Sequence, residues 1–252
     1  EQYNSGTAQP KLNKQTCLRL PISIPPTLAE QQAIAEALSD ADTLIEGLES
    51  LIAKKRAIKQ GTVQELLTGK RRLPGFEGEW IIAPIKRICS MKSGNSITGD
   101  QIDDHSAYPC FGGNGLRGYT SAYTHDGVYC LIGRQGALCG NVVVARGKFF
   151  ASEHAVVVST NNEADTNWLA YVLQRMNLNQ YSESSAQPGL SVTKLLVLEL
   201  YFPPTAAEQS AIATILTGMD DEIAALESKL TKARAVKQGM MQELLTGRIR
   251  LV

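Results

Sequence analysis

The sequence predicts an α+β protein in which a mixed α/β domain is flanked by two long helices that form an antiparallel coiled coil. Three observations support this fold class: an internal repeat, apolar residues at heptad spacing in both copies, and short apolar segments broken by glycine, asparagine and serine between the copies. The chain of 252 residues is long enough for one or two domains. Its 43% hydrophobic and 20% charged content is ordinary for a soluble protein.

The repeat is ungapped and covers both ends of the chain. The stretch IPPTLAEQQAIAEAL at Ile24–Leu38 returns as FPPTAAEQSAIATIL at Phe202–Leu216, and Pro203 follows Pro25 by 178 residues. The stretch KKRAIKQGTVQELLTGKRRL, which ends at Leu73, returns with the same offset as KARAVKQGMMQELLTGRIRL. We therefore expect two copies of one module, the first without its front part, in a C-terminal fragment of a two-repeat protein. The expected parts are a remnant of a first domain at 1–24, a helical region at 25–74, a middle domain at 75–202 and a second helical region at 203–252.

Each repeated region is predicted to form one long helix of a coiled coil. Thr27 and Thr205 follow a Pro-Pro pair and are suited to cap a helix, with Glu30 and Glu208 three residues later as capping-box partners. Apolar residues then recur at alternating spacings of four and three, which is the seam of a coiled coil. The expected helix–helix interface consists of Ile34, Leu38, Ile45, Leu48, Ile52, Ile212, Leu216, Ile223, Leu226 and Leu230.

The sign of the charged residues changes along each predicted helix. Acidic residues crowd the first half of each helix and basic residues the second half. The line of the seam passes through Lys55, Lys59 and Thr62 in the first helix and through Lys237 in the second. Two such helices laid antiparallel place acidic halves against basic halves, whereas parallel helices would bring like charges together. A plain solvated face is the alternative, because runs of charge often serve only solubility.

The middle of the chain has the pattern of a mixed α/β domain with long loops. Strands are expected in EWIIAPIKRICSM, GVYCLIG, NVVVA, FFASEHAVVVST and KLLVLELYF, and a helix is expected at Ala164–Met176. The five cysteines and three histidines lack the spacing of a metal site, so we expect reduced thiols in a cytoplasmic protein. No apolar run is long enough to span a bilayer, so no membrane partner is expected.

The glycine pattern of CFGGNGLRGYT, at Cys110–Thr120, also occurs in dinucleotide-binding loops, but its surroundings argue against that function. Tyr108–Phe111 is a poor strand before the glycines, and no helix is predicted after them. A P-loop is missing, and so is the Asn/Asp-Pro-Pro-aromatic motif of methyltransferases that modify base amino groups. Asp103-Asp104-His105 is the nearest approach to a catalytic cluster, and an exposed loop is the simpler interpretation of it. We therefore expect no cofactor, no metal and no catalytic residues.

Polar residues set between glycines in the loops are the candidates for contacts to DNA. Asparagine and glutamine can pair with adenine and arginine with guanine, and glycine lets the backbone approach a phosphate. Surface turns stabilised by asparagine and glycine are the alternative. From Gly75 to Glu199 there are nine Lys/Arg and eleven Asp/Glu, so this domain would bind DNA weakly alone and rely on a partner for phosphate contacts. The candidate residues are Asn95, Ser96, Asn114, Arg117, Tyr119, Arg134, Gln135, Lys148, Ser184 and Gln187.

The segments GGNGLRGY, YCLIGRQG and SAQPGL, and the doubled PPTxAEQ…KQGxxQELLTG module, resemble the specificity subunit of type I restriction–modification systems. The resemblance covers essentially the whole chain. It implies that 75–202 is the second target recognition domain, 1–24 the remnant of the first, and 25–74 and 203–252 the central and C-terminal conserved regions. It implies double-stranded DNA and modification (methyltransferase) subunits as partners, and the restriction subunit indirectly. It also implies that the chain has no catalytic residues of its own.

The predicted function is therefore that of a sequence-specific DNA-recognition and scaffold subunit, which reads one half of a bipartite target and docks methyltransferase subunits. Because most of the first recognition domain is missing, pairing of two copies of the fragment as a homodimer stays open. One alternative is a coiled-coil assembly module whose middle domain binds a protein partner. Another is a self-contained methyltransferase or nuclease, for which the sequence contains neither a cofactor loop nor a carboxylate–lysine cluster.

Overall fold

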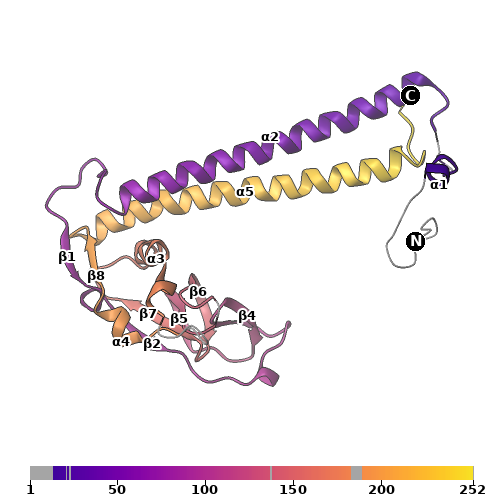
Figure 1. The fold of residues 1–252 in the computed structure, drawn as a ribbon. Coiled ribbons are helices and arrows are strands. Elements are labelled where there is room, and N and C mark those ends of the chain that lie inside the picture. Colours follow the sequence, from indigo (N-terminus) through magenta and orange to yellow (C-terminus); the bar gives the residue numbers. More distant parts are fainter. Residues whose placement is uncertain (1–13, 21, 23, 137, 183–188, 252) are drawn as a thin grey trace. The chain divides into compact units, whose positions relative to one another are not determined.

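The chain folds as an α+β protein with two long helices, as the sequence predicts (Figure 1). The structure, a computed structural model, describes residues 14–20, 22, 24–136, 138–182 and 189–251. The helices are α1 (Lys14–Leu18), α2 (Leu28–Leu66), α3 (Thr166–Arg175), α4 (Val192–Leu196) and α5 (Ala206–Leu244), with 3-10 turns at Ile85–Arg87, Gly99–Gln101 and Leu178–Tyr181. The strands are β1 (Ile81–Pro84), β2 (Cys89–Ser93), β3 (Tyr108–Gly112), β4 (Gly115–Thr120), β5 (His125–Gly133), β6 (Val142–Ala151), β7 (Ala155–Thr160) and β8 (Glu199–Phe202).

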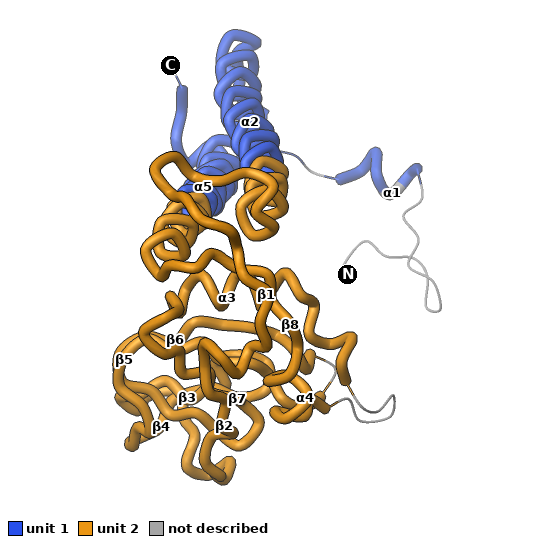
Figure 2. Tube along the Cα trace, turned by 90° about the vertical axis from the view of Figure 1, so that its left-hand side faces the viewer, with its two compact units in different colours: residues 1–56, 222–252 blue, residues 57–221 orange. Residues whose placement is uncertain are grey.

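The chain divides into two compact units, residues 1–56 with 222–252 and residues 57–221 (Figure 2). Helices α2 and α5 each contribute residues to both units. The domain expected at 75–202 lies wholly inside the second unit, whereas each of the expected helical regions is shared between the two. Within the described residues, no helix is both long enough and apolar enough to cross a membrane.

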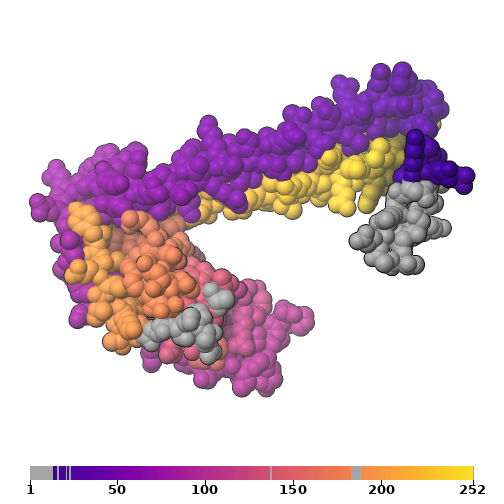
Figure 3. Space-filling view, in the orientation of Figure 1, coloured from indigo at the N-terminus to yellow at the C-terminus, as the bar shows by residue number. Residues whose placement is uncertain are grey.

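Helices α2 and α5 are each 39 residues long, which corresponds to about 58 Å at 1.5 Å per residue. They run antiparallel, because the residue numbers of ion-paired partners rise on one helix as they fall on the other. In the first unit, Arg56 pairs with Glu227 and Glu49 with Arg234, each at 2.6 Å. The side chains of the two helices lie in contact on the face seen in Figure 3. The sequence-predicted arrangement of acidic halves against basic halves is therefore confirmed.

Both long helices begin at the predicted threonine caps. The backbone N–H of Glu30 donates to Thr27 Oγ1 at 3.2 Å, and that of Glu208 donates to Thr205 Oγ1 at 3.3 Å. The glutamates, however, do not act as capping-box partners. Their carboxylates accept instead from arginines that follow the C-terminal end of the other helix, because a charged guanidinium is a stronger donor than a backbone amide.

The six-stranded sheet of the second unit has the strand order β2-β7-β5-β6-β3-β4. Neighbouring strands are antiparallel except β3 and β6, which run parallel where Cys110 faces Phe150 and Phe111 faces Ala151. A separate ladder joins β1 to β8 antiparallel. Strands β5, β6 and β7 therefore form the centre of the sheet, and the β3–β4 hairpin forms one edge.

Three expectations about the middle domain are corrected by the structure. Tyr108–Phe111 is a strand after all, and the glycine-rich stretch after it forms the turn and the second strand of the β3–β4 hairpin. The segment EWIIAPIKRICSM is two strands separated by a 3-10 turn, and KLLVLELYF begins as α4 before it becomes β8. Tertiary pairing overrides local propensity here: Pro109 is tolerated in β3, and short apolar runs do not distinguish strand from buried helix.

Both faces of the sheet are covered, which accounts for the continuous apolar runs in its central strands. Cys130 and Ile132 of β5 point into the main core with Trp168 of α3, and Leu131 points into a smaller cluster around Phe149 on the opposite face. Of the described cysteines, four are buried and Cys17 is exposed, and none forms a disulfide. Burial raises the pKa of the Cys89 thiol to about 12, which keeps it protonated and unreactive. The other buried cysteines are Cys110, Cys130 and Cys139.

Candidate functional site

A cavity of about 650 Å³ in the second unit opens at one edge of the six-stranded sheet. Ligand pockets in proteins typically have volumes of about 300–1,000 Å³. The tip of the β3–β4 hairpin, the loop that follows β5 and the turn between β6 and β7 come together around this cavity. We call it the hairpin cavity. Its lining residues are Gly112, Gly113, Asn114, Gly115, Leu116, Arg117, Gln135, Gly136, Leu138 and His154.

Backbone hydrogen bonds fix the three segments to one another. Ser152 N–H donates to Phe111 O at 2.8 Å, and Arg134 N–H donates to His154 O at 2.8 Å. The hairpin tip and the end of β5 lie so close that a Cβ atom added at Gly133 would be 1.9 Å from the carbonyl oxygen of Gly113. Only glycine fits there, so the close approach that builds the cavity depends on the glycine-rich sequence.

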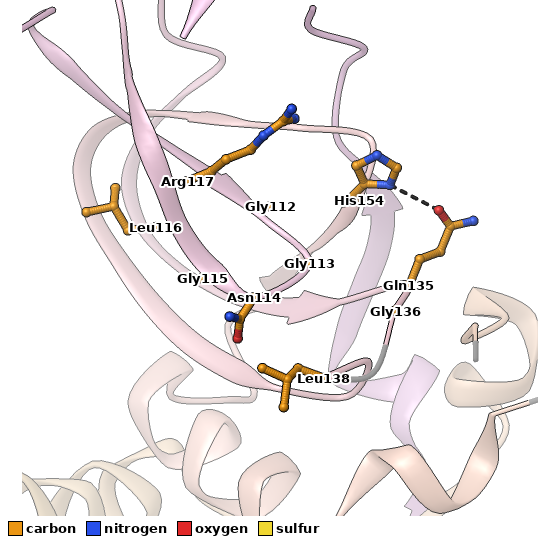
Figure 4. A pocket seen from close by; sticks show the side chains of 10 residues that line it. All are labelled: Gly112, Gly113, Asn114, Gly115, Leu116, Arg117, Gln135, Gly136, Leu138 and His154. Carbon is orange, nitrogen blue, oxygen red and sulfur yellow. Dashed lines mark hydrogen bonds between the residues drawn. The ribbon is translucent and has the colours of Figure 1, made fainter. Parts of the chain in front are cut away.

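Hydrogen-bonding groups with different specificities surround the cavity (Figure 4). The hairpin contributes Asn114 and Arg117, both exposed, on one side, and Gln135 and His154 lie on the other. His154 Nδ1 donates to Gln135 Oε1 at 3.0 Å, which orients the glutamine and leaves its amide NH₂ group to donate outwards. A carboxamide and a guanidinium are the side chains that form bidentate hydrogen bonds to adenine and guanine edges.

Apolar side chains complete the rim of the cavity. Leu116 is 53% exposed and Leu138 is 54% exposed, although both are large aliphatic residues. Exposed leucines beside amide and guanidinium groups are suited to contact the methyl group or the face of a base. The cavity therefore combines hydrogen-bonding groups for polar edges with apolar groups for flat or methylated surfaces.

Two buried polar atoms belong to the turn between β6 and β7, which contributes His154 to the cavity. Ser152 Oγ and Glu153 Oε2 are buried, and neither makes a hydrogen bond within the described part of the chain. Ser152 lies close behind the hairpin, since a Cβ added at Gly112 would be 3.5 Å from its Oγ. Buried polar groups in proteins are usually paired, so unpaired ones next to a cavity are typical of a place where a ligand or water completes the bonding.

The sequence-predicted candidates divide into three groups. Asn114, Arg117 and Gln135 line the cavity, while Arg134 supports its base by donating from Nη1 to Ser93 Oγ at 3.1 Å. Four candidates lie in the second unit outside the lining: Asn95 and Ser96 are exposed after β2, Tyr119 is half-buried in β4, and Lys148 is exposed on β6. Two more, Ser184 and Gln187, lie outside the described residues.

Three of the candidates outside the cavity have structural partners. Lys148 Nζ lies over the ring of Tyr123 at 4.8 Å from its centroid, which is a cation–π contact. Tyr119 exchanges two backbone hydrogen bonds with Asp103, at 2.9 and 2.7 Å, and so ties the hairpin to the preceding loop. Asn95 N–H donates to Ala151 O at 2.9 Å, which brings the loop after β2 close to the turn before β7.

Sequence reasoning missed His154, Leu116 and Leu138. His154 was included in a long expected strand, FFASEHAVVVST, which the structure divides into the end of β6, a turn and β7. The run of polar residues Ser152-Glu153-His154 inside that apolar segment is the signal that marks the turn. Nothing in the local pattern marks the two leucines, because their exposure depends on the neighbouring strands.

The acidic loop that came nearest to a catalytic cluster is a turn. Asp103 Oδ1 accepts from the backbone N–H groups of His105 and Ser106 at 2.7 and 2.6 Å, and Oδ2 accepts from Ser106 Oγ at 2.7 Å. These hydrogen bonds, with that from the Ser106 hydroxyl contributing most, lower the pKa of the Asp103 carboxyl below its usual value. Its donors are therefore local, and across the described ranges no group of three or more His, Cys, Asp or Glu side chains could hold a metal ion.

A family model described as "Type I restriction modification DNA specificity domain" matches residues 1–55 and 77–233. The chain belongs to this family. The resemblance expected from the sequence is therefore confirmed, and the match covers most of both long helices and of the six-stranded sheet.

Several members of the specificity family are similar to this chain. It is 47% identical over 154 residues to the Type I restriction enzyme EcoprrI specificity subunit of Escherichia coli, a match that covers 60% of this chain and 37% of that protein. It is 27% identical over 171 residues to a putative specificity subunit of Haemophilus influenzae, S.HindORF215P, covering 64% of this chain and 41% of that protein. The chain thus spans less than half the length of these curated relatives.

The fold is also found in a solved structure of the specificity family. The crystal structure of the type-I restriction-modification system S subunit from M. genitalium superposes with a TM-score of 0.75 at 17% sequence identity. The match covers 97% of this chain and 68% of that one. At this low identity the likeness is one of fold, and it shows that long paired helices with a mixed α/β domain are an arrangement used in this family.

Proposed function

We propose that this chain is a sequence-specific DNA-recognition and scaffold subunit of a type I restriction–modification complex. In this proposal the domain at 75–202 reads one half of a bipartite target, and the helices α2 and α5 dock methyltransferase subunits. The chain itself has no catalytic role, and methyl transfer and cleavage belong to its partners. Family membership supports the proposal, and the hairpin cavity supplies the residues.

The observation that carries the proposal is the convergence of Asn114, Arg117 and Gln135 on one cavity. These side chains come from the hairpin and from the loop after β5, and they are of the types that read base edges in the major groove. The carboxamide of Gln135 is oriented in advance by its hydrogen bond to His154, so less rotamer entropy is lost when Gln135 pairs with a base. The exposed leucines at the rim favour contact with a thymine methyl group.

The charge of the recognition domain supports a partner-dependent mode of binding. Its excess of two acidic residues provides no phosphate-binding surface of the kind that gives tight non-specific binding to DNA. Base contacts therefore specify the sequence in this proposal, and the methyltransferase subunits supply most of the phosphate contacts.

An exposed apolar line on α2 supports docking of a protein partner in the first unit. Leu44 and Leu51, which are seven residues apart and hence on one side of the helix, are 57% and 40% exposed. Their repeat counterparts on α5 are Glu222 and Lys229. Apolar side chains retained on one helix only are typical of a surface that a partner covers.

The decisive experiment combines this chain with a methyltransferase subunit of a type I system and selects bound duplexes from a randomised pool. We expect the complex to enrich a single asymmetric half-motif. Arg117→Ala should weaken selection at one position about tenfold or more, since a bidentate base contact contributes about 1–3 kcal/mol. Arg175→Ala, on the last turn of α3 and outside the cavity, is the matched control and should leave selection unchanged.

Other outcomes distinguish the alternatives. A stable complex that enriches no sequence would reject DNA recognition and leave the chain as an assembly module. A palindromic pair of identical half-motifs would mean that two copies of the chain assemble in one complex. Selection that survives Arg117→Ala unchanged would reject the hairpin cavity as the reading surface.

A further inference from the structure

The second unit contains a tryptophan that packs against the end of the repeated module. The ring of Trp80 covers Gly69, and a Cβ added at that glycine would be 3.2 Å from the ring. Trp80 Nε1 donates to Glu208 Oε1 at 3.3 Å. The carboxylate of Glu208 also accepts from Arg72, at 3.0 Å from Nε and 2.6 Å from Nη2. Leu67, two residues before Gly69, is only 3% exposed. We call this group the filled socket: Leu67, Gly69, Arg72, Phe202 and Glu208.

The residues after Trp80 extend the contact as a strand. In the β1–β8 ladder, Ile81 faces Phe202 and Ala83 faces Leu200. The ladder buries the apolar side chains of β8, so that Phe202 is 1% exposed and Leu200 is 5% exposed. Trp80 and β1 thus cover the module as one segment. The indole of Trp80 lies on Gly69, after the end of α2, and β1 pairs with β8.

The first unit contains equivalent residues 178 positions away, and among the described residues none covers them as Trp80 covers the filled socket. The counterpart of the Arg72–Glu208 pair is the pair of Arg250 with Glu30, at 2.8 Å from Nε and 2.7 Å from Nη2. The counterpart of Gly69, Gly247, has nearly the same backbone, with φ of 73° against 69°, but nothing lies within 4 Å of a Cβ added there. We call this group the open socket: Leu245, Gly247, Arg250, Ile24 and Glu30.

The exposed fractions show the same contrast. Leu245 is 49% exposed where its counterpart Leu67 is 3% exposed, and Ile24 is 64% exposed where Phe202 is 1% exposed. A cavity of about 230 Å³ lies between these groups in the first unit. Helix α1 corresponds residue for residue to α4, so this part of the repeated module has the same secondary structure in both copies.

We propose that the open socket binds an extended segment that carries a tryptophan followed by a short apolar strand. The indole would lie on Gly247 and Leu245 and donate its N–H to Glu30, and the strand would pass alongside Ile24. The occupant is a segment from outside residues 14–251, because both tryptophans of the chain, Trp80 and Trp168, are buried in the second unit, at 7% and 1% exposed. This proposal concerns a surface separate from the hairpin cavity and goes beyond the proposed reading of DNA.

Two physical reasons favour this occupant over an arbitrary apolar one. The carboxylate of Glu30 is only 5% exposed and already shares Arg250, so it can accept one further N–H donor but repels acidic groups. A strand that pairs by main-chain hydrogen bonds gains affinity from β-augmentation, and its alternate side chains give specificity. The filled socket shows both contacts made by one continuous segment, Glu79–Pro84.

The test uses the full chain and a fluorescently labelled peptide with the sequence of residues 76–84, FEGEWIIAP. We expect saturable binding by fluorescence anisotropy. A peptide with alanine in place of the tryptophan should bind at least tenfold more weakly. Leu245→Asp should weaken binding to a similar extent, whereas Ile58→Asp, at an exposed isoleucine of α2 in the second unit, should leave it unchanged. Sedimentation of the unlabelled variants, with circular dichroism to confirm helix content, accompanies the titration.

Three outcomes would overturn the proposal. Absence of saturable binding by the folded chain would reject the socket. Binding that is equal for the alanine peptide, or equal for Leu245→Asp, would place the peptide elsewhere. A dimer that Leu245→Asp dissociates would show that a second copy of the chain, and not another segment, is the occupant. The duplex selection with Arg117→Ala is independent of all three outcomes.

Discussion

Asp42 on α2 and Lys237 on α5 form an ion pair, and their repeat counterparts, Asp220 and Lys59, form the same ion pair. The lysines occupy the seam of the coiled coil, where their side chains are 26% and 23% exposed. In a parallel pair each lysine would meet its own counterpart and lack a carboxylate. A polar residue in the seam is a known device for specifying orientation, so these pairs select the antiparallel arrangement.

The first prediction concerns this pair. Lys237→Glu places a second carboxylate beside Asp42 and should lower the free energy of unfolding by about 1 kcal/mol, since a half-exposed ion pair is lost and like charges meet. The charge swap Asp42→Lys with Lys237→Glu restores opposite charges and should recover most of the loss. Urea unfolding followed by circular dichroism measures both variants. Lys54→Glu, at an exposed position, is the control, and a double variant no more stable than the single one would contradict the assignment.

The second prediction concerns the close approach of β5 and the hairpin. Gly133→Ala puts a methyl group against the carbonyl of Gly113, so the hairpin must move or the strand must bend, at a cost of about 2 kcal/mol or more. Gly99→Ala is the matched control, because a Cβ there meets no atom within 4 Å. Thermal unfolding and the duplex selection should both be impaired in the first variant only. Equal stability of the two variants would show that the two segments do not approach as described.

The third prediction tests whether His154 orients Gln135 in the hairpin cavity or contacts DNA itself. His154→Ala removes the donor that holds Gln135, so selection at the base that Gln135 is proposed to contact should weaken about fivefold, which corresponds to about 1 kcal/mol for one hydrogen bond. Binding to a random duplex should be unchanged, since no phosphate contact is lost. His154→Asn keeps a donor of similar reach and should recover part of the selectivity. A uniform loss of binding to all duplexes would instead indicate that His154 contacts the backbone of DNA.

The fourth prediction concerns acid. A hydrogen bond from Arg250 is the main cause that lowers the pKa of the Glu30 carboxyl below its usual value of 4.5. A group whose pKa is lower in the folded state stabilises the fold above its unfolded pKa, and this stabilisation is lost as the pH falls through the folded value. The urea concentration at the midpoint of unfolding should therefore decrease as the pH is lowered from 6 to 3. In the Glu30→Gln variant this decrease should be smaller. Part of the slope should remain in that variant, because hydrogen bonds also lower the pKa of Asp100 and Asp103. Identical slopes for wild type and variant would exclude a contribution from the Glu30 pair.

The long helices illustrate what could be predicted and why. Their caps, their length and their antiparallel pairing follow from local patterns: threonine after Pro-Pro, heptad spacing, and charge that changes sign along each copy. Each of these signals lies within a few turns of one helix, so it survives in the sequence. The role of Glu30 and Glu208 did not follow from such signals, because their arginine partners are 220 and 136 residues away.

The hairpin cavity illustrates the opposite case. Asn114, Arg117 and Gln135 could be proposed from glycine-rich loops, but His154, Leu116 and Leu138 could not. Their positions depend on strand order and register, and β3 pairs with β6 across a sequence separation that no local pattern encodes.

By itself, the sequence determined the family, the two-copy organisation and the helices of this protein, because a repeat and a heptad pattern are properties of the chain alone. Only the tertiary structure decided which loops meet at the sheet edge and which copy of the repeated module is covered. Leu67 and Leu245 occupy the same place in the same motif, yet one is 3% exposed and the other 49%. Burial is a relation between distant segments, and identical local sequences acquire different surroundings when only one of them finds a partner.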